Sequence, residues 1–425
     1  MAQKKIALIS DHASPLAMAG GVDSGGQNVY VAQVARHLAA LGHHVDVFTR
    51  RDRSDVPEIL EWLPCVRVIH VPAGPAEFVR KEDLLPVMPA FSRYVRDFCR
   101  ATNDYDLVHA NFFMSGVAAV ECKRALGLPI VVTFHALGLV RRLHQGEADD
   151  FPPERLAIEQ ELMTEADAIV AECPQDFADL TELYEADPAK IAVIPCGVAP
   201  EEFWPIARRF ARKTLGLDKD ERVVLQLGRL VPRKGIDNAI RGVAQLAHEH
   251  GIRVRLLVVG GNSDIPDPAL TPEIGRLQTL AASLGIAERV TFTGRRAREL
   301  LKLYYSAADV FVTTPWYEPF GITPLEAMAC ATPVIGARVG GLKHSVVDGT
   351  TGFLVPPNDP ELLARRLAEL YADPGRSRQL GRAALRRVNR HFTWQKVARS
   401  IAALYDDVAA GNVQNGRRGR MPVAA

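Results

Sequence analysis

Residues 310–337 read VFVTTPWYEPFGITPLEAMACATPVIGA. The unbroken apolar run at 310–313 predicts a buried strand, and a second run at 333–337 predicts another. The polar loop after the first strand leads into a predicted helix. Two strands joined by a helix form the unit from which parallel α/β sheets are built.

The same alternation of apolar strands and helical stretches runs along most of the chain. Continuously apolar strands are typical of parallel sheets that helices cover on both faces. We therefore predict an α/β fold with two consecutive, Rossmann-like, doubly wound domains. The first series of strands is predicted at 6–10, 45–49, 66–71, 106–110, 130–134, 168–171 and 191–194, and the second at 222–227, 254–259, 290–293, 310–313, 333–337 and 352–355.

The length of 425 residues suits two domains. Turn-forming residues cluster at 195–205, PCGVAPEEFWP, where we place the seam. We expect an N-terminal domain over 1–200 and a C-terminal domain over 201–392. The last residues, 411–425, have the composition of a disordered tail.

Composition excludes several classes of function. Lys and Arg number 51 against 50 Asp and Glu, which argues against a dedicated nucleic-acid-binding protein. The six cysteines lack zinc or disulfide-scaffold spacing, so we expect reduced thiols and a cytoplasmic location. No apolar run reaches about 18 residues, and no membrane span is predicted. An arginine-rich stretch at 365–390 is interpreted as a solvated helical surface, although peripheral membrane contact and a homo-oligomer stay open.

The loop from Asp11 to Gly26 ends in Gly25-Gly26, directly before a helix that begins near Gln27. Free N–H groups at a helix N-terminus suit a phosphate. The alternative is an ordinary glycine-rich turn. The loop does not match GxGxxG, so a nicotinamide site is not predicted.

Charged residues follow two strands of the second series. Arg229 and Lys234, in GRLVPRKG, could neutralise a diphosphate, the alternative being a solvated basic loop. Glu318 and Glu326 flank a helix start, and their carboxylates could accept hydroxyl hydrogen bonds from a ribose or a hexose. The alternative for Glu326 is a charge that favours the helix N-terminus.

Two histidines, His109 and His135, each end a predicted strand of the first series, in LVHAN and VVTFH. Either one alone would be interpreted as a core or surface histidine. Because both fall at strand ends, which converge in a parallel sheet, we predict a functional role for them.

These motifs resemble, in order and at fitting intervals, a family of retaining glycosyltransferases. The carriers are GGVDSGGQNVYV, TFHALG, GRLVPRKG and EPFGITPLEAMACATPVIGARVGG. The family, glycosyltransferase family four or "group 1", includes sucrose synthases, sucrose-phosphate synthases and the mycothiol-pathway enzyme. The resemblance covers residues 5–410. It implies the GT-B fold, in which two Rossmann-like domains face each other across a cleft and a C-terminal helix, here 393–410, crosses back to the first domain.

The resemblance also implies roles for individual residues. The implied catalytic residues are His135, Arg229, Lys234 and Glu318. The implied donor-binding residues are Gly25, Gly26, Gly294, Arg295, Glu326, Gly340, Gly341 and Leu342. The implied acceptor-binding residues are Gln27, Lys81, His109, Arg141 and Arg155. No metal and no cofactor is expected, because the nucleotide sugar is a co-substrate and no aspartate-rich metal motif is apparent.

The expected function is transfer of a hexosyl group from a UDP-, ADP- or GDP-sugar to a small anionic or sugar acceptor. Phe112 and Ala136 stand where the mycothiol-pathway enzyme has hydroxyl-bearing residues, which disfavours an inositol phosphate. Two alternatives stay open: a GT-B relative that works on nucleotide sugars without transfer, such as an epimerase, and a non-catalytic nucleotide-sugar-binding protein. The sequence does not name the base, the sugar or the acceptor.

Overall fold

A computed structural model describes residues 2–17 and 25–412. Within these ranges, residues 2–17, 26–195 and 394–412 form one compact unit, and residues 196–393 form a second. The sequence places the domain boundaries at 200 and 392, a few residues from these limits. Residues 18–24 of the predicted glycine-rich loop and 413–425 of the predicted tail lie outside the described residues.

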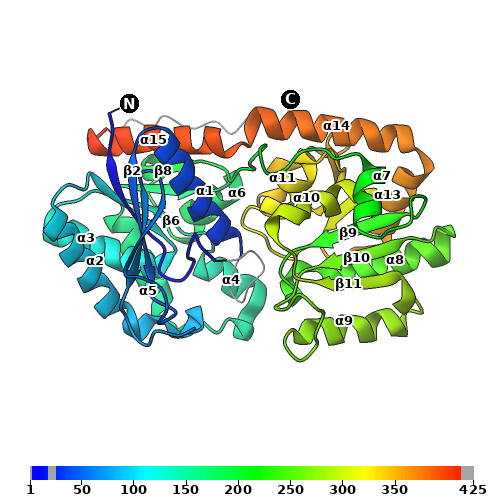
Figure 1. The fold of residues 1–425 in the computed structure, drawn as a ribbon, viewed down its shortest axis with the longest axis horizontal. Coiled ribbons are helices and arrows are strands. Elements are labelled where there is room, and N and C mark those ends of the chain that lie inside the picture. Colours follow the sequence, from blue (N-terminus) through cyan, green and yellow to red (C-terminus); the bar gives the residue numbers. More distant parts are fainter. Residues whose placement is uncertain (1, 18–24, 413–425) are drawn as a thin grey trace. The chain divides into compact units, whose positions relative to one another are not determined.

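The first unit is built on an eight-stranded sheet in the order β3-β4-β2-β1-β5-β6-β7-β8 (Figure 1). All pairs are parallel except β3 with β4. Its strands are β1 (Lys5–Ile9), β2 (His44–Arg50), β3 (Ile59–Leu63), β4 (Val66–Val71), β5 (Leu107–Asn111), β6 (Ile130–Thr133), β7 (Ala168–Ala171) and β8 (Ile191–Val193).

The strand β3 (Ile59–Leu63) was missing from the sequence prediction. It pairs antiparallel at the edge of the sheet, and its side chains are exposed or half-buried. An edge strand that faces solvent does not need the continuous apolar run by which the interior strands are recognised. The predicted strands 6–10, 45–49, 66–71, 106–110, 130–134, 168–171 and 191–194 match the other seven to within one residue at each end.

Seven α-helices of the first unit complete its layers. They are α1 (Gly26–Ala40), α2 (Met88–Thr102), α3 (Phe113–Leu126), α4 (Gly138–Gln145), α5 (Glu154–Glu165), α6 (Pro174–Leu183) and α15 (Trp394–Ala409).

The C-terminal helix α15 belongs to the first unit although the whole second unit precedes it in the chain. The rings of Trp394 and Tyr30, on α1, lie 5.7 Å apart in an edge-on arrangement. The hydroxyl of Tyr405 lies 2.6 Å from Nδ1 of His109. His109 is a fully buried residue of β5. Lys4 and Asp406 form an ion pair. These contacts fix the helix to the first sheet.

The second unit holds a six-stranded parallel sheet in the order β11-β10-β9-β12-β13-β14. Its strands are β9 (Val223–Leu227), β10 (Arg255–Val259), β11 (Val290–Gly294), β12 (Val310–Thr313), β13 (Val334–Ala337) and β14 (Gly352–Val355). Its helices are α7 (Arg208–Thr214), α8 (Ile236–His250), α9 (Pro272–Ser283), α10 (Arg298–Ala307), α11 (Ile322–Ala329), α12 (Leu342–Ser345), α13 (Pro360–Ala372) and α14 (Pro374–His391).

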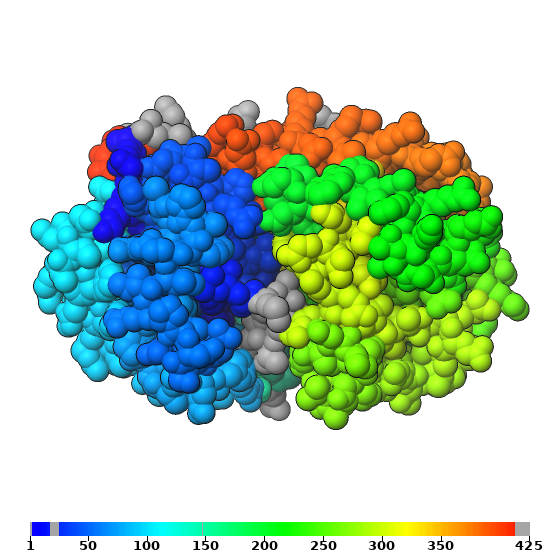
Figure 2. Space-filling model, viewed as in Figure 1, coloured from blue at the N-terminus to red at the C-terminus, as the bar shows by residue number. Residues whose placement is uncertain are grey.

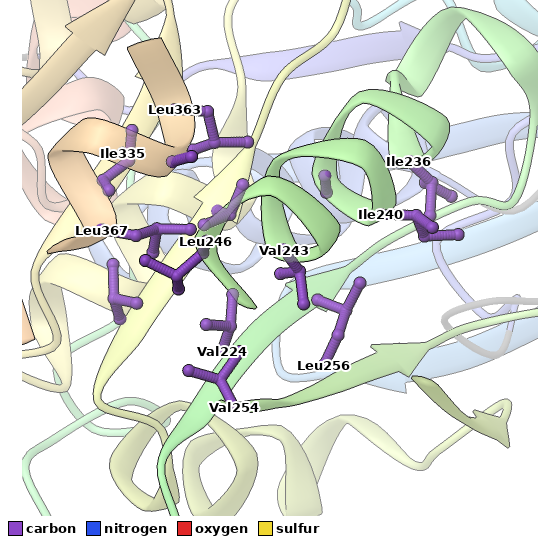
Figure 3. Close-up of a cluster of buried hydrophobic side chains, with 14 of the residues drawn as sticks. Val224, Ile236, Ile240, Val243, Leu246, Val254, Leu256, Ile335, Leu363 and Leu367 are labelled. Carbon is purple, nitrogen blue, oxygen red and sulfur yellow. The ribbon is translucent and has the colours of Figure 1, made fainter. Parts of the chain in front are cut away.

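Helices cover both faces of the second sheet. On β12, Val310 and Val312 belong to a buried cluster with side chains of α8 and α13 (Figure 3). The residue between them, Phe311, packs against Tyr305 of α10, with ring centroids 5.4 Å apart. Because neighbouring residues of a strand point to opposite faces, α8 and α13 cover one face and α10 covers the other. Two covered faces explain the continuously apolar strands.

The arginine-rich stretch forms helix α14 and part of α13. Arg378, Arg382 and Arg386 are exposed at four-residue spacing, and the opposite side of α14 buries Leu380 and Ala384. The helix lies at the surface of the second unit (Figure 2). None of the helices in the described ranges is long and apolar enough to cross a membrane. The six cysteines are free thiols, and five of them are buried.

We expect Tyr405→Phe to lower the free energy of unfolding of the first unit by about 1–2 kcal/mol. The substitution deletes one hydroxyl and leaves a ring nitrogen of the fully buried His109 without its partner. Urea unfolding, monitored through the hydrogen exchange of first-unit amides, measures the change in the free energy of unfolding. Tyr94→Phe is the matched control, because the Tyr94 hydroxyl bonds Glu58 at the surface. Equal losses in both variants would contradict the anchoring role of Tyr405.

Candidate active site

Two loops meet at the carboxyl edge of the second sheet because β9 and β12 are neighbours in it. Lys234 lies in a 3-10 turn, Pro232–Lys234, after β9, and Glu318 lies in the loop after β12. The Lys234 ammonium and the Glu318 carboxylate form an ion pair. The guanidinium of Arg233 stands 3.8 Å from the same carboxylate.

Backbone contacts hold these two loops in register. The N–H of Trp316 donates to the carbonyl of Arg233 at 3.0 Å, and the hydroxyl of Thr314 donates to the carbonyl of Gly235 at 2.8 Å. Gly235 has φ 63°, and a Cβ there would come within 1.8 Å of the Thr314 carbonyl oxygen. Only glycine permits this approach. The position of Lys234 is therefore fixed on both sides of the turn.

The electrostatics of the pair favour an added anion. Burial lowers the pKa of Lys234, and Glu318 offsets only part of this effect. Burial alone would raise the pKa of Glu318, but the charges of Lys234, Arg233 and Arg229 outweigh it and hold this pKa below its usual range. Three cations therefore surround one carboxylate. Lys234 also keeps 18% of its side chain exposed, so a ligand can reach it.

Glu326 is buried on α11, with 2% of its surface exposed. One carboxylate oxygen accepts from the Arg298 guanidinium at 2.8 Å, and the other accepts from the Tyr305 hydroxyl at 2.9 Å. A carboxylate has about four lone-pair sites, so two remain for further donors. Arg298 is itself held by Glu202 at 2.8 Å and lies over the ring of Phe203.

The glycine pair Gly340-Gly341 shapes the loop that carries Glu318. A Cβ on Gly340 would stand 1.8 Å from the Glu318 carbonyl oxygen, and the N–H of Gly341 donates to the Pro319 carbonyl at 3.0 Å. Leu342, the next residue, has a fully buried side chain, and its N–H donates to the Val339 carbonyl at 3.1 Å. Its donor-binding role stays a prediction.

Gly294 and Arg295 lie at the carboxyl end of β11. The N–H of Arg295 donates to the carbonyl of Ser263 at 2.7 Å, and its guanidinium lies 3.1 Å from Asp264. These contacts tie the end of β11 to the loop after β10. Both predicted donor-binding residues thus border the same sheet edge as Lys234.

His135 follows β6 at the carboxyl edge of the first sheet. Its Nδ1 lies 3.0 Å from the Glu172 carboxylate, and its Nε2 lies 3.0 Å from Oδ1 of Asn111. The ring also meets Tyr30 edge-on at 4.7 Å. The backbone at His135 has φ 60°, which a residue with a side chain rarely adopts.

Gln27 lies at the start of α1, next to this edge. Its side-chain amide lies 3.3 Å from both the Ser10 hydroxyl and the Asn111 carbonyl. Gly25 and Gly26 immediately precede it, Gly25 half-buried and Gly26 exposed. Residues 18–24 of that loop are not among the described residues.

His109 does not line an open site. It is fully buried, with Nδ1 at 2.6 Å from the Tyr405 hydroxyl and Nε2 at 2.8 Å from the Thr133 hydroxyl. Burial, followed by the neighbouring His135, lowers its pKa to about 3. The structure therefore favours the core interpretation of His109 over a contact with an acceptor, because both ring nitrogens are committed to protein partners.

Each of the three cations assigned to the acceptor has an acidic neighbour. Lys81 lies 3.1 Å from Glu82, and Arg141 lies 2.9 Å from Asp149. Arg155 is 1% exposed, pairs with Glu159 at 2.7 Å and lies within 5.0 Å of three phenylalanine rings. The burial of Arg155 contradicts the alternative of a solvated charge, and its pairing with Glu159 leaves its acceptor-binding role a prediction. Lys81 and Arg141 stay half-buried.

Four residues of these edges escaped the sequence analysis. Arg298 and Tyr305 are seven residues apart on α10, which places them on one face of a helix, and this spacing was a usable signal. Asn111 and Glu172 end or directly follow β5 and β7. Polar residues at strand ends were the criterion for His109 and His135, and the same criterion would have found both. Across the described ranges, no group of His, Cys, Asp and Glu side chains has the arrangement of a metal site.

Comparisons with known proteins agree on one family. A family model described as glycosyl transferases group 1 matches residues 207–387, and one described as glycosyltransferase family 4 matches residues 24–202. The D-inositol 3-phosphate glycosyltransferase of Acidothermus cellulolyticus is 39% identical over 413 residues, which cover 96% of this chain and 91% of that protein. The enzyme of the same name from Corynebacterium efficiens is 36% identical, over 97% of each chain.

Solved structures agree with the fold. Sucrose-phosphate synthase from Thermosynechococcus elongatus has a TM-score of 0.89 and 36% identity, covering 96% of this chain and 100% of that one. Anabaena HepE, solved with UDP and glucose, has a TM-score of 0.74 at 21% identity, covering 95% of this chain and 100% of that one, a likeness of fold alone. Both sheets described above and the near-complete coverage of these relatives lead to one conclusion. The chain belongs to the group 1 glycosyltransferases and is a glycosyltransferase with the GT-B fold.

Proposed function

We propose that the protein is a retaining hexosyltransferase that uses a UDP-, ADP- or GDP-sugar as donor and a small hydroxyl-bearing molecule as acceptor. The observation that carries the proposal is the Lys234–Glu318 pair with Arg233 beside it and the charge of Arg229 acting on both. This cluster has an excess of positive charge at the carboxyl edge of the second sheet, where ligands of parallel α/β sheets bind. A diphosphate supplies the missing negative charge.

Donor binding rearranges the cluster. A diphosphate takes over the Lys234 ammonium, which without ligand is bound to Glu318. The Glu318 carboxylate then accepts hydrogen bonds from sugar hydroxyls. The two lone-pair sites of Glu326 that Arg298 and Tyr305 leave open suit the two hydroxyls of a ribose.

The transfer step uses the leaving group itself. The bond between the anomeric carbon and the phosphate oxygen breaks while the acceptor oxygen attacks the same face. The acceptor proton passes to the departing phosphate oxygen, so the configuration is retained. Negative charge develops on the diphosphate as it leaves, and a preorganised cation such as Lys234 stabilises that charge more in the transition state than in the ground state.

The acceptor is proposed to be a small anionic molecule, such as a sugar phosphate. The similar enzymes from Acidothermus and Corynebacterium carry D-inositol 3-phosphate in their names. In this chain, however, Phe112 and Ala136 offer no hydroxyl, and Lys81 and Arg141 each have an acid beside them. Because hydroxyls are missing and the cations have acidic neighbours, we expect weaker contacts with an acceptor phosphate than in those enzymes. We therefore propose an acceptor other than inositol phosphate.

Lys234→Ala and Arg229→Ala should each reduce turnover by at least about a hundredfold, because a lost charge at the leaving group costs about 3 kcal/mol. Release of nucleoside diphosphate from UDP-, ADP- and GDP-sugars, with and without acceptors, measures the effect. Lys213→Ala, an exposed lysine of α7, is the control. Near-normal turnover in both variants would overturn the phosphate assignment. Donor binding without any transfer or hydrolysis would favour a non-catalytic binding protein, and a changed sugar without transfer would favour an epimerase.

The first-formed product should keep the donor's anomeric configuration. Proton NMR of the product, recorded before mutarotation, decides this from the coupling of the anomeric proton. An inverted configuration would mean that attack comes from the face opposite the phosphate. That outcome would require a base near the acceptor and would remove the front-face mechanism.

A phosphorylated acceptor should be used better than its free form, by up to about tenfold, since acidic neighbours compete for the cations and a tenfold ratio corresponds to 1.4 kcal/mol. Added salt should weaken the preference. The measurement is kcat/KM for matched pairs of free and phosphorylated sugars, in the wild type and in Lys81→Ala. The anionic-acceptor proposal fails if free sugars are used equally well and Lys81→Ala changes nothing.

A further inference from the structure

We propose that Asn111 and Glu172 hold the imidazole of His135 with a proton on each ring nitrogen, so that the ring acts as an oriented cation and never as a base. Glu172 is then a positioning residue, a role that neither the sequence motifs nor the comparisons assign. The protonation follows from the contacts of the first unit alone. Its link to sugar transfer rests on the proposed function.

The Asn111 side chain fixes the proton on Nε2. Its amide nitrogen donates to the Ile9 carbonyl at 3.3 Å, so its amide oxygen faces His135. The reverse orientation would set the amide oxygen against the Ile9 carbonyl oxygen, two acceptors with no proton between them. An amide oxygen can only accept. The Nε2 atom at 3.0 Å from it must therefore carry a hydrogen.

Glu172 fixes the proton on Nδ1. Its carboxylate oxygen lies 3.0 Å from that nitrogen, and both side chains are less than one-tenth exposed. A neutral ring would need the proton on the carboxyl group instead. A second acid stands next to Glu172: the carboxylate of Asp176, on α6, accepts from the Glu172 backbone N–H at 2.9 Å. Burial, and then the charge of Glu172, raise the pKa of Asp176 to about 7.

Asp176 therefore takes up a proton near neutral pH and then adds no second negative charge beside the carboxyl group that faces the ring. Among the described residues, His109 and Tyr30 also lie close to His135. His109, on β5, has its pKa lowered to about 3 by burial and then by His135, so it stays neutral. Tyr30, on α1, presents a ring edge. An imidazolium paired with one carboxylate is the arrangement that satisfies both ring nitrogens.

The backbone around the His135 ring is strained at two residues. His135 has φ 60°, and Phe112, which directly follows Asn111, has φ 84° and ψ 158°, a region that is essentially confined to glycine. Such conformations are strained and persist only where the surrounding structure holds them in place. One of them is at His135 itself, and the other directly follows Asn111, its partner at Nε2.

The chemical consequence concerns the acceptor proton. A ring with hydrogens on both nitrogens has no lone pair, so His135 cannot take up that proton. It contributes a fixed positive charge and a fixed orientation. The proton must then leave with the phosphate oxygen, which agrees with the front-face step proposed above.

The test uses full-length protein labelled with 15N-histidine, with His135 assigned by its loss in His135→Gln. Long-range 1H–15N spectra at pH 7.5 should show both ring nitrogens of His135 protonated. In Glu172→Gln, one nitrogen should lose its proton, and kcat/KM should fall about tenfold. Glu182→Gln changes an exposed acid on α6, the helix that follows Glu172 in the chain, and should alter neither spectrum nor rate.

An unprotonated Nδ1 in the wild type would overturn the proposal, since the carboxyl group would then hold the proton. So would a Glu172→Gln spectrum identical to the wild type. The wild-type spectrum decides even if the variant fails to fold. The spectrum does not depend on turnover, so a protein with a doubly protonated His135 and no transferase activity would refute the proposed function and leave this inference standing. Full activity in a folded Glu172→Gln with a neutral ring would refute the positioning role.

Discussion

The parallel pairing of β9 with β12 is the constraint on which the proposed donor site depends. It brings Lys234 and Glu318, 84 residues apart in sequence, to one edge and into an ion pair. The contact between these two loops sets requirements on neighbouring residues. Gly235 must lack a side chain to let Thr314 approach, and Gly340 must lack one to let the Glu318 loop pass. The helix α11 begins at Ile322 and places the Glu326 carboxylate where Arg298 and Tyr305 donate hydrogen bonds to it.

The two sheet edges differ in how their charges are balanced. At the second sheet, the charges of Lys234, Arg233 and Arg229 all act on the Glu318 carboxylate and hold its pKa below its usual range. At the first sheet, Arg155 and Glu159 form a closed pair among aromatic rings, and His135 faces Glu172. Charges that are already paired and buried hold a shape and do not attract a ligand strongly. The donor edge is therefore suited to bind an anion, and the other edge is suited to orient groups.

Much of the fold could be predicted from sequence because both sheets are covered on two faces. That environment favours continuous apolar runs, as in β1, β7 and β12. The strand that the sequence does not predict, β3, lies at an exposed edge. Site residues were less predictable, because a strand end places a side chain at the right edge but does not say whether it is buried. His109 and His135 look alike in sequence, yet Tyr405, from the far end of the chain, encloses only His109. The burial of Arg155 was not predictable either, since two of the three rings around it, Phe112 and Phe113, come from a distant part of the sequence.

The most direct test of the central claim is the thermal stability of the wild-type protein with nucleosides and nucleoside diphosphates of uracil, adenine and guanine. A ligand that binds only the folded state stabilises it by RT ln(1 + [L]/Kd), which is about 2.7 kcal/mol at a hundredfold excess over Kd. We predict that one nucleoside diphosphate raises the melting temperature clearly and that its parent nucleoside does so far less, because Lys234, Arg229 and Arg233 act on the diphosphate. Equal shifts for nucleoside and diphosphate, or no shift with any diphosphate, would contradict a donor site built on these charges.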